Sequence, residues 1–300
     1  MLDLPKIAAV FATLDRSRTA ESCVMALARQ ARPPEWVIVA DNASTDDTVA
    51  LLISLKDLPF KLVVHEVGKN LGNAGGVKEA MEFAFAEGAD AVWILDDDSW
   101  PRENALKALL DEVWNPHVVR HALQINPKTG MFTWPMWIQG ASGWELAFDP
   151  SELPEVAMMP SRSSWTGALV SKHVWNEVGP VNGELFIRGE DEEYPWRIQQ
   201  AGFLHEAVLG AIMDHPGPEK IVHWRFFGKN FFFERGLAES KLYYKIRNMV
   251  WLKRRQAGDL QAVSIALTYC VAAILLDGPG RLGLLKRAIN DGWRGRLGRM

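Results

Sequence analysis

The chain is poor in cysteine and in net charge, and each of these shortages excludes a class of protein. Two cysteines among 300 residues, Cys23 and Cys270, cannot form a disulfide framework and lack zinc-ligand spacing, which favours a reducing compartment. The net charge of −4 argues against bulk binding to nucleic acid. Residues 1–16 have neither the basic segment nor the cleavage site of a secretory signal, so we expect a cytoplasmic protein.

The first hundred residues alternate between short apolar runs and amphipathic segments. Strands are predicted at residues 6–13, 36–42, 61–67 and 91–95, and helices at residues 18–30, 46–55 and 74–88. This order predicts an α/β fold with a mainly parallel sheet and helices on both faces. In such a fold, ligands bind at the carboxyl ends of the strands.

Carboxylates follow several of these predicted strands. Asp96, Asp97 and Asp98 come directly after the apolar run at residues 91–95. Three adjacent like charges raise one another's pKa unless something positive lies among them. A solvent-exposed turn could tolerate them through screening by water, whereas a divalent cation would explain them at a ligand-binding edge.

Three further segments carry polar residues in positions that favour function. The glycine-rich stretch "NLGNAGG", residues 70–76, predicts either a tight turn or a close backbone approach to an anion at a helix N-terminus. "GEDEE", residues 189–193, is typical of an acidic first helical turn, where Asp191 is a candidate general base. His215 follows another apolar run and could complete an oxygen-rich metal site, although a lone histidine is more often structural.

Taken in order, these motifs resemble the inverting family 2 glycosyltransferases of the GT-A fold. The shared series is Thr-x-Asp-Arg after the first strand, "ADNASTDDT", "NLGNAGG", the aspartate triplet and the Glu-Asp helix, over roughly residues 6–250. "ELFIRGEDEE", "DHP" and "LYYKIRN" are most similar to the galactofuranosyltransferases. The resemblance implies a Rossmann-like GT-A nucleotide-sugar-binding domain at residues 1–235 and a C-terminal helical, basic extension at residues 236–300.

The resemblance also implies roles for single residues. The nucleotide side of the site is assigned to Thr13, Asp15, Asp41, Asn73, Asp96 and Asp97. Asp98 and His215 are the implied ligands of Mn²⁺ or Mg²⁺, Asp191 is the implied catalytic base, and Trp165 and Glu190 are placed on the acceptor side. One carboxylate suffices for inversion, because no protein nucleophile is needed.

The expected reaction is transfer of galactofuranose from UDP-galactofuranose to a hydroxyl of a glycan or of a polyprenyl-diphosphate-linked acceptor. The nearest alternative is a rhamnosyltransferase that uses dTDP-rhamnose. A non-catalytic nucleotide-sugar-binding module and a metal-dependent nucleotide hydrolase are alternatives from other classes. An acceptor requirement for turnover would separate the transferase from the hydrolase.

The C-terminal region combines an apolar run with many basic residues. Residues 260–276 are almost continuously apolar, at the short limit for a membrane span, and a buried helix explains that length equally well. The flanking basic residues are Lys241, Lys245, Arg247, Lys253, Arg254, Arg255, Arg281, Lys286, Arg287, Arg294, Arg296 and Arg299. Such residues are attracted to an anionic leaflet. We therefore expect a peripheral enzyme on the cytoplasmic face of the cell membrane.

Overall fold

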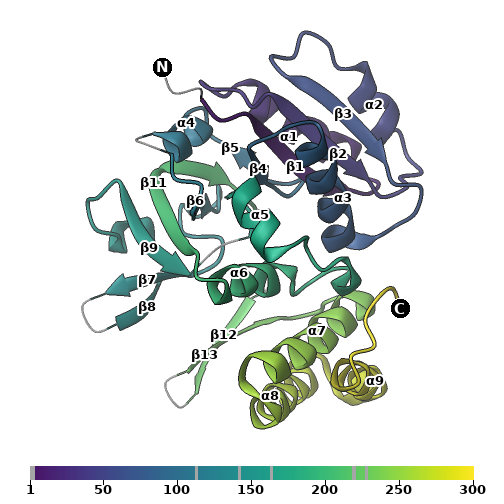
Figure 1. The fold of residues 1–300 in the computed structure, drawn as a ribbon. Coiled ribbons are helices and arrows are strands. Elements are labelled where there is room, and N and C mark those ends of the chain that lie inside the picture. The colour runs from purple at the N-terminus through teal and green to yellow at the C-terminus, as the bar shows by residue number, and fades with distance from the viewer. Residues whose placement is uncertain (1–3, 112–113, 141–142, 163–164, 218–220, 227–228) are drawn as a thin grey trace. The chain divides into compact units, whose positions relative to one another are not determined.

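The computed structural model describes residues 4–111, 114–140, 143–162, 165–217, 221–226 and 229–300. Contacts within the chain divide it into two compact units (Figure 1). The first unit comprises Met1–Asn182 and Asp191–Gly217, and the second comprises Gly183–Glu190 and Pro218–Met300. The domain boundary expected between residues 235 and 236 stays a prediction.

The first unit is built on one large sheet. Its strands are β1 Ile7–Thr13, β2 Trp36–Asp41, β3 Lys61–Glu66, β4 Ala91–Ile94, β5 Trp100–Pro101, β6 Val118–Ile125, β7 Met136–Gly140, β8 Gly143–Ala147, β9 Met158–Arg162, β10 Ala168–Ser171 and β11 Leu204–Asp214. The strand order is β3-β2-β1-β4-β10-β6-β11-β9-β7-β8, with β5 paired to β11. Strands β3, β2, β1 and β4 are parallel, as are β6 and β11, and β10 runs antiparallel between these two groups.

Helices cover both faces of this sheet. They are α1 Ser17–Ala28, α2 Thr48–Ser54, α3 Gly72–Ala86, α4 Ala105–Leu110, α5 Lys172–Val178 and α6 Glu190–Gln200, with a short 3-10 helix at Pro150–Glu152. Every residue of β1 is buried, as expected for a central parallel strand covered on both sides. Alternate residues of β1, such as Phe11, pack with α1, whereas Ala12 faces α3. The predicted α/β fold is therefore confirmed, with an antiparallel extension along the β9-β7-β8 edge.

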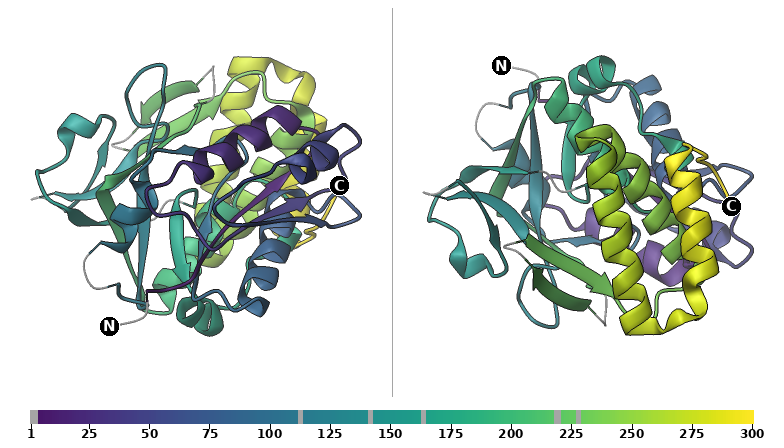
Figure 2. Two further views of the ribbon diagram at one scale, coloured as in Figure 1. Left: turned by 90° about the horizontal axis from the view of Figure 1, so that it is seen from above. Right: turned by 90° about the horizontal axis from the view of Figure 1, so that it is seen from below.

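The second unit consists of a hairpin and three helices. Its elements are the 3-10 helices Gly183–Leu185 and Pro279–Arg281, strands β12 Ile221–Phe226 and β13 Lys229–Glu234, and helices α7 Glu239–Ala257, α8 Asp259–Asp277 and α9 Leu282–Trp293. The predicted C-terminal helical extension is confirmed. Figure 2 shows α7, α8 and α9 lying side by side, with α7 in contact with both other helices.

Candidate active site

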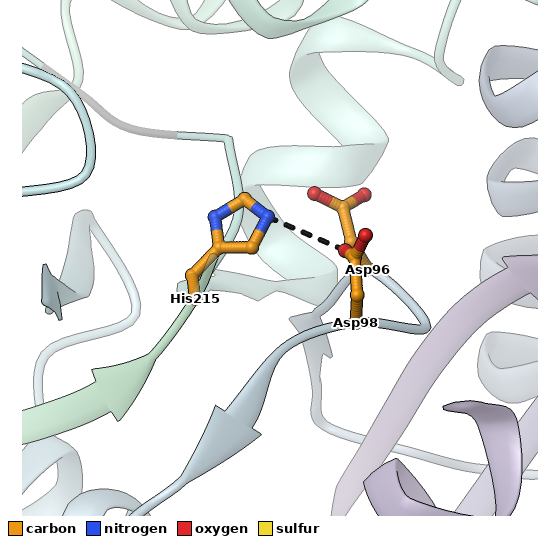
Figure 3. A group of neighbouring side chains, drawn as sticks. All are labelled: Asp96, Asp98 and His215. Carbon is orange, nitrogen blue, oxygen red and sulfur yellow. Dashed lines mark ion pairs between the residues drawn. The ribbon is translucent and has the colours of Figure 1, made fainter. Parts of the chain in front are cut away.

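The aspartate triplet and His215 meet at one edge of the sheet. Asp96, Asp97 and Asp98 follow β4, and His215 follows β11. One ligand atom from each of Asp96, Asp98 and His215 lies within 4.8 Å of the other two (Figure 3). The His215 Nε2 atom is 3.3 Å from an Asp98 carboxylate oxygen. Two carboxylates and one imidazole form a donor set that fits Mn²⁺ or Mg²⁺.

Hydrogen bonds from other parts of the first unit orient Asp96 and His215. Asp96 accepts hydrogen bonds from the Thr166 hydroxyl at 2.6 Å and from the Asn73 amide at 3.4 Å. The Nδ1 atom of His215 is 3.0 Å from the Gln124 side-chain oxygen, which directs Nε2 toward Asp98. Such partners fix the orientation of a histidine ligand.

A guanidinium group supplies the positive charge that the triplet requires. Arg16 donates one hydrogen bond to Asp97 at 2.6 Å and another to Asp98 at 2.9 Å. Thr13 donates its hydroxyl proton to Asp97 at 2.9 Å. Burial still raises the pKa of Asp97 to about 6, although Arg16 opposes this shift. The triplet is thus supported by the protein itself and does not depend on a metal alone.

Asp98 and His215 stabilise each other's charged forms. Burial alone would raise the pKa of Asp98, but the hydrogen bond with His215 and the charge of Arg16 outweigh burial and lower this pKa to about 2. Burial alone would lower the pKa of His215, but the contacts with Asp98 and Asp96 raise it. Asp98 is therefore anionic at neutral pH.

The residues after β1 and β2 form the neighbouring part of this edge. Asp15 has a positive φ of 50°, and its carboxylate accepts hydrogen bonds from the Thr45 and Asp46 backbone amides, so it holds the turn after β2. Asp41 is buried, and one of its carboxylate oxygens accepts from Ser44 N. The other oxygen has no hydrogen-bond partner among the described residues. An orphaned buried oxygen is consistent with a ligand contact at Asp41.

The glycine-rich turn opens α3 and packs it tightly against the sheet. A Cβ atom at Gly76 would lie 2.7 Å from the Ala12 Cβ atom, and one at Gly75 would lie 2.5 Å from the Leu71 Cβ atom. The Asn42 side chain secures the turn by accepting from Leu71 N and donating to the Gly72 carbonyl. Packing against β1 thus explains Gly76, and crowding by Leu71 at the start of the helix explains Gly75. Asn73, in the same turn, reaches Asp96.

Helix α6 carries the predicted base at its start. Asp191 is exposed, whereas Glu190 is buried. One turn later, the Tyr194 ring meets the Trp165 ring edge-on, with the ring centres 6.1 Å apart. Trp165 is 4% exposed and precedes Thr166, which binds Asp96, so α6 is tied to the aspartate cluster through buried contacts. The assigned roles of Asp191, Glu190 and Trp165 stay predictions.

Comparison with known proteins identifies the family. The profile of glycosyl transferase family 2 matches residues 9–160, which is half of the chain. The chain belongs to this family. It is accordingly a glycosyltransferase, and the sequence resemblance to family 2 is confirmed.

Individual relatives and solved structures agree with this family. Galactofuranosyltransferase GlfT1 of Mycolicibacterium smegmatis is 27% identical over 221 residues, 70% of each chain. Staphylococcus aureus TarS 1–349, solved in complex with UDP-GlcNAc, has a TM-score of 0.56 at 14% identity over 96% of this chain and 80% of that one. Mannosyltransferase PcManGT of Pyrobaculum calidifontis, solved with GDP-Man and Mn²⁺, has a TM-score of 0.54 at 17% identity. The match covers 100% of this chain and 77% of that one.

These structures confirm the predicted GT-A fold. Some matches are partial: the chain spans 63% of the Mycobacterium tuberculosis GlfT1 and 54% of the solved GalNAc-T7 chain.

The sequence did not assign roles to several residues that complete the cluster. Arg16 belongs to the Thr-x-Asp-Arg motif, and it is the one charged residue of that motif to which the sequence assigned no role. Thr166 follows the assigned Trp165, whereas Gln124 and Thr133 stand in segments without a motif. The Thr133 hydroxyl donates to the His215 carbonyl at 2.6 Å. Only the fold brings these four residues to the site.

Proposed function

We propose that this glycosyltransferase transfers galactofuranose from UDP-galactofuranose, with inversion, to a hydroxyl of a glycan or polyprenyl-diphosphate-linked acceptor. The observation that carries the proposal is the Asp96–Asp98–His215 cluster in a chain of family 2. The similarity to galactofuranosyltransferase GlfT1 supports the choice of donor.

On the donor side, Asp98 and His215 would hold Mn²⁺ or Mg²⁺, with Asp96 beside them. A divalent cation at this place neutralises the charge of a nucleoside diphosphate leaving group. Arg16 adds a fixed positive charge at the same edge. The free carboxylate oxygen of the buried Asp41 is an acceptor for an N–H group of a base, as the assignment to the nucleotide side requires.

On the acceptor side, Asp191 would take the proton from the attacking hydroxyl group. Its exposure supports this role, because a base must reach a hydroxyl that arrives from solvent. The hydroxyl oxygen then bonds to the anomeric carbon as the bond from that carbon to the diphosphate breaks. A single displacement of this kind inverts the anomeric configuration.

A donor panel tests the proposal. UDP-galactofuranose, UDP-galactopyranose, UDP-GlcNAc and dTDP-rhamnose are each supplied with Mn²⁺, with and without a lipid-linked glycan acceptor, and release of the nucleotide is measured. We expect acceptor-dependent UDP release from UDP-galactofuranose. If dTDP-rhamnose is the one donor that is turned over, the protein is a rhamnosyltransferase. Equal turnover with and without acceptor would indicate a hydrolase.

We also propose that α8 docks on the cytoplasmic face of the membrane. Helix α8 is long and apolar enough to cross a bilayer, and 22% of its apolar window is buried. Its exposed side carries Leu260, Val263, Leu267, Val271 and Ile274, which share one helical stripe. Its other side packs small residues, including Ala262 and Ala266, into the core of the second unit.

Docking in the membrane plane fits the neighbouring helices better than spanning does. Helices α7 and α9 pack with α8 and expose Arg254, Arg255, Lys286 and Arg287, which would oppose burial in hydrocarbon. The expected basic surface is smaller than the sequence indicated. Arg247 is buried and donates to the carbonyl oxygens of Leu185 and Gly298, so it stabilises the fold instead of facing a membrane.

Sedimentation with vesicles of phosphatidylglycerol and phosphatidylcholine tests this docking. Leu267→Glu places a charge at a residue that is 62% exposed on α8, and Ile53→Glu on α2 is the control at 59% exposure. We expect Leu267→Glu to reduce binding at least tenfold and Ile53→Glu to leave it unchanged. Equal binding by both variants, or a wild-type protein that stays in the supernatant, would refute the docking proposal.

A further inference from the structure

The outer face of the β8-β7-β9 edge carries an unusual set of side chains. Trp137 lies opposite Arg162 on β9, and Gln139 lies opposite Trp144 on β8. Because side chains alternate between the two faces of a sheet, these four residues share one face, which we call the tryptophan face. The intervening residues Met136, Ile138, Ala147 and Met159 pack into the core on the other face.

The tryptophan face breaks the usual pattern of an antiparallel edge. A solvent-facing side is normally polar, yet Trp137 and Trp144 are both 38% exposed there. The Arg162 guanidinium lies 5.4 Å from the ring centre of Trp137 and 5.0 Å from that of Trp144. The cation–π contacts hold both rings in place before any ligand binds, which lowers the entropic cost of binding.

The chemistry of this face matches a sugar chain. A sugar ring has C–H groups on its faces and hydroxyl groups around its rim. The C–H groups carry partial positive charge and are attracted to the negative face of an indole ring. Gln139 and Arg162 can donate hydrogen bonds to the hydroxyl groups. A lipid surface would require a cluster of cations, whereas this face carries one cation, which is already engaged with the two rings.

The tryptophan face is connected to the aspartate cluster by a short stretch of backbone, residues 133–137. Thr133 binds the His215 carbonyl, the next residue, Trp134, is exposed, and β7 begins at Met136. Four residues of extended chain span at most about 14 Å, so Trp137 lies within that distance of Thr133 along the backbone. A chain of a few sugar units can therefore extend from the cluster to the tryptophan face.

We propose that Trp137, Trp144, Gln139 and Arg162 form a glycan subsite that binds acceptor sugars remote from the reacting hydroxyl group. The proposal rests on the proposed function, because it requires a glycan acceptor. The subsite would raise the affinity for longer acceptors without taking part in bond making. It predicts an effect on KM that grows with acceptor length and an unchanged kcat.

Binding of defined oligosaccharides tests the subsite. Galactofuranosyl disaccharide and tetrasaccharide are titrated by calorimetry into the wild type, into Trp137→Ala/Trp144→Ala and into Trp137→Phe/Trp144→Phe. Val156→Ala, at an exposed residue outside the tryptophan face, is the control. We expect the double alanine variant to bind the tetrasaccharide at least about tenfold more weakly, because two aromatic contacts are lost. The phenylalanine variant should recover most of the affinity.

Further measurements separate this proposal from the proposed function and from a lipid-binding role. If no UDP-galactofuranose is turned over but the tetrasaccharide binds and the alanine variant does not bind it, the donor assignment fails and the subsite stands. If turnover proceeds and the KM for the tetrasaccharide is the same in all variants, the subsite is refuted. Loss of binding to phosphatidylglycerol vesicles in the alanine variant, without loss of oligosaccharide binding, would also overturn it in favour of a membrane contact.

Discussion

The packing of α3 on β1 provides a sharp test of how the glycine-rich turn works. Gly76 lies in the second turn of α3, where an added Cβ atom would be 2.7 Å from the Ala12 Cβ atom and 2.9 Å from the Asn42 Nδ2 atom. Carbon atoms in good contact are about 3.5–4.0 Å apart, so Gly76→Ala overlaps the strand by about 1 Å. The helix must move away from β1 to accommodate the methyl group.

The magnitude follows from two opposing effects. Overpacking of this kind costs about 1–3 kcal/mol, and an overlap of about 1 Å belongs near the upper end of that range. Replacing glycine by alanine inside a helix gains about 1 kcal/mol. We expect Gly76→Ala to lower the free energy of unfolding by about 2 kcal/mol. Since Asn73 links this turn to Asp96, the affinity for a nucleotide sugar should fall as well.

Urea unfolding and hydrogen exchange of the α3 amides measure the effect, and a double-mutant cycle isolates its cause. Ala12→Gly removes the nearest of the atoms that the added methyl group would meet, so Ala12→Gly/Gly76→Ala should recover about 1–2 kcal/mol of coupling energy. Gly283→Ala in α9 is the helix control, because an added Cβ atom there meets nothing within 4 Å. If Gly76→Ala were as stable as Gly283→Ala, or if Ala12→Gly gave no rescue, the packing explanation would be refuted.

Three further predictions concern the site and the stability of the folded protein. Asp98→Ala should abolish turnover and weaken Mn²⁺ binding at least about 100-fold, as measured by electron paramagnetic resonance. Its circular dichroism spectrum should be unchanged. Near-normal activity in saturating Mn²⁺ would count against the metal role. Asp191→Asn should lower kcat at least ~10²-fold with donor affinity unchanged, whereas the same result for Glu190→Gln would make Glu190 the base.

Burial lowers the pKa of His121 from 6.5 to about 4. As the pH falls below 6.5, the His121 imidazole therefore binds a proton in the unfolded chain before it does so in the folded protein. The free energy of unfolding should then decrease by about 3 kcal/mol between pH 6.5 and pH 4, and an identical pH profile for His121→Gln would contradict this.

Local patterns allowed the sequence to predict the scaffold and the grouping of Asp96, Asp98 and His215. Apolar runs and strand ends are encoded within a few neighbouring residues, and parallel strands necessarily bring their carboxyl ends to one edge. Asp96 and Asp98 follow a run that lies entirely in the core. His215 follows another strand, β11, and the resemblance to family 2 assigned it to the same site. The comparison with solved structures confirmed that fold.

The remaining features depend on contacts between distant parts of the chain. Arg16 reaches Asp97 and Asp98 across more than 80 residues, and its place in the Thr-x-Asp-Arg motif does not indicate which carboxylates it contacts. The pattern of residues 132–144 predicts strands around Gly/Ser turns, but which face of the hairpin is exposed depends on its register with β9. The glycine-rich turn was equally compatible with an anion site and with tight packing, because both require the absence of a Cβ atom.

The aspartate cluster is arranged before any cation enters it. Asp96 is held by Thr166, Asp98 by Arg16, and His215 by Gln124, so each side chain has a partner that keeps its ligand atom in place. Repulsion among the three carboxylates is balanced by a guanidinium group, which cannot lose its proton in a protein. An entering cation would thus replace the contact between His215 and Asp98 and leave the strand ends where they are. A site whose groups are already oriented spends little binding energy on reorganisation, and more of the interaction is then available for the charge that develops on the leaving diphosphate.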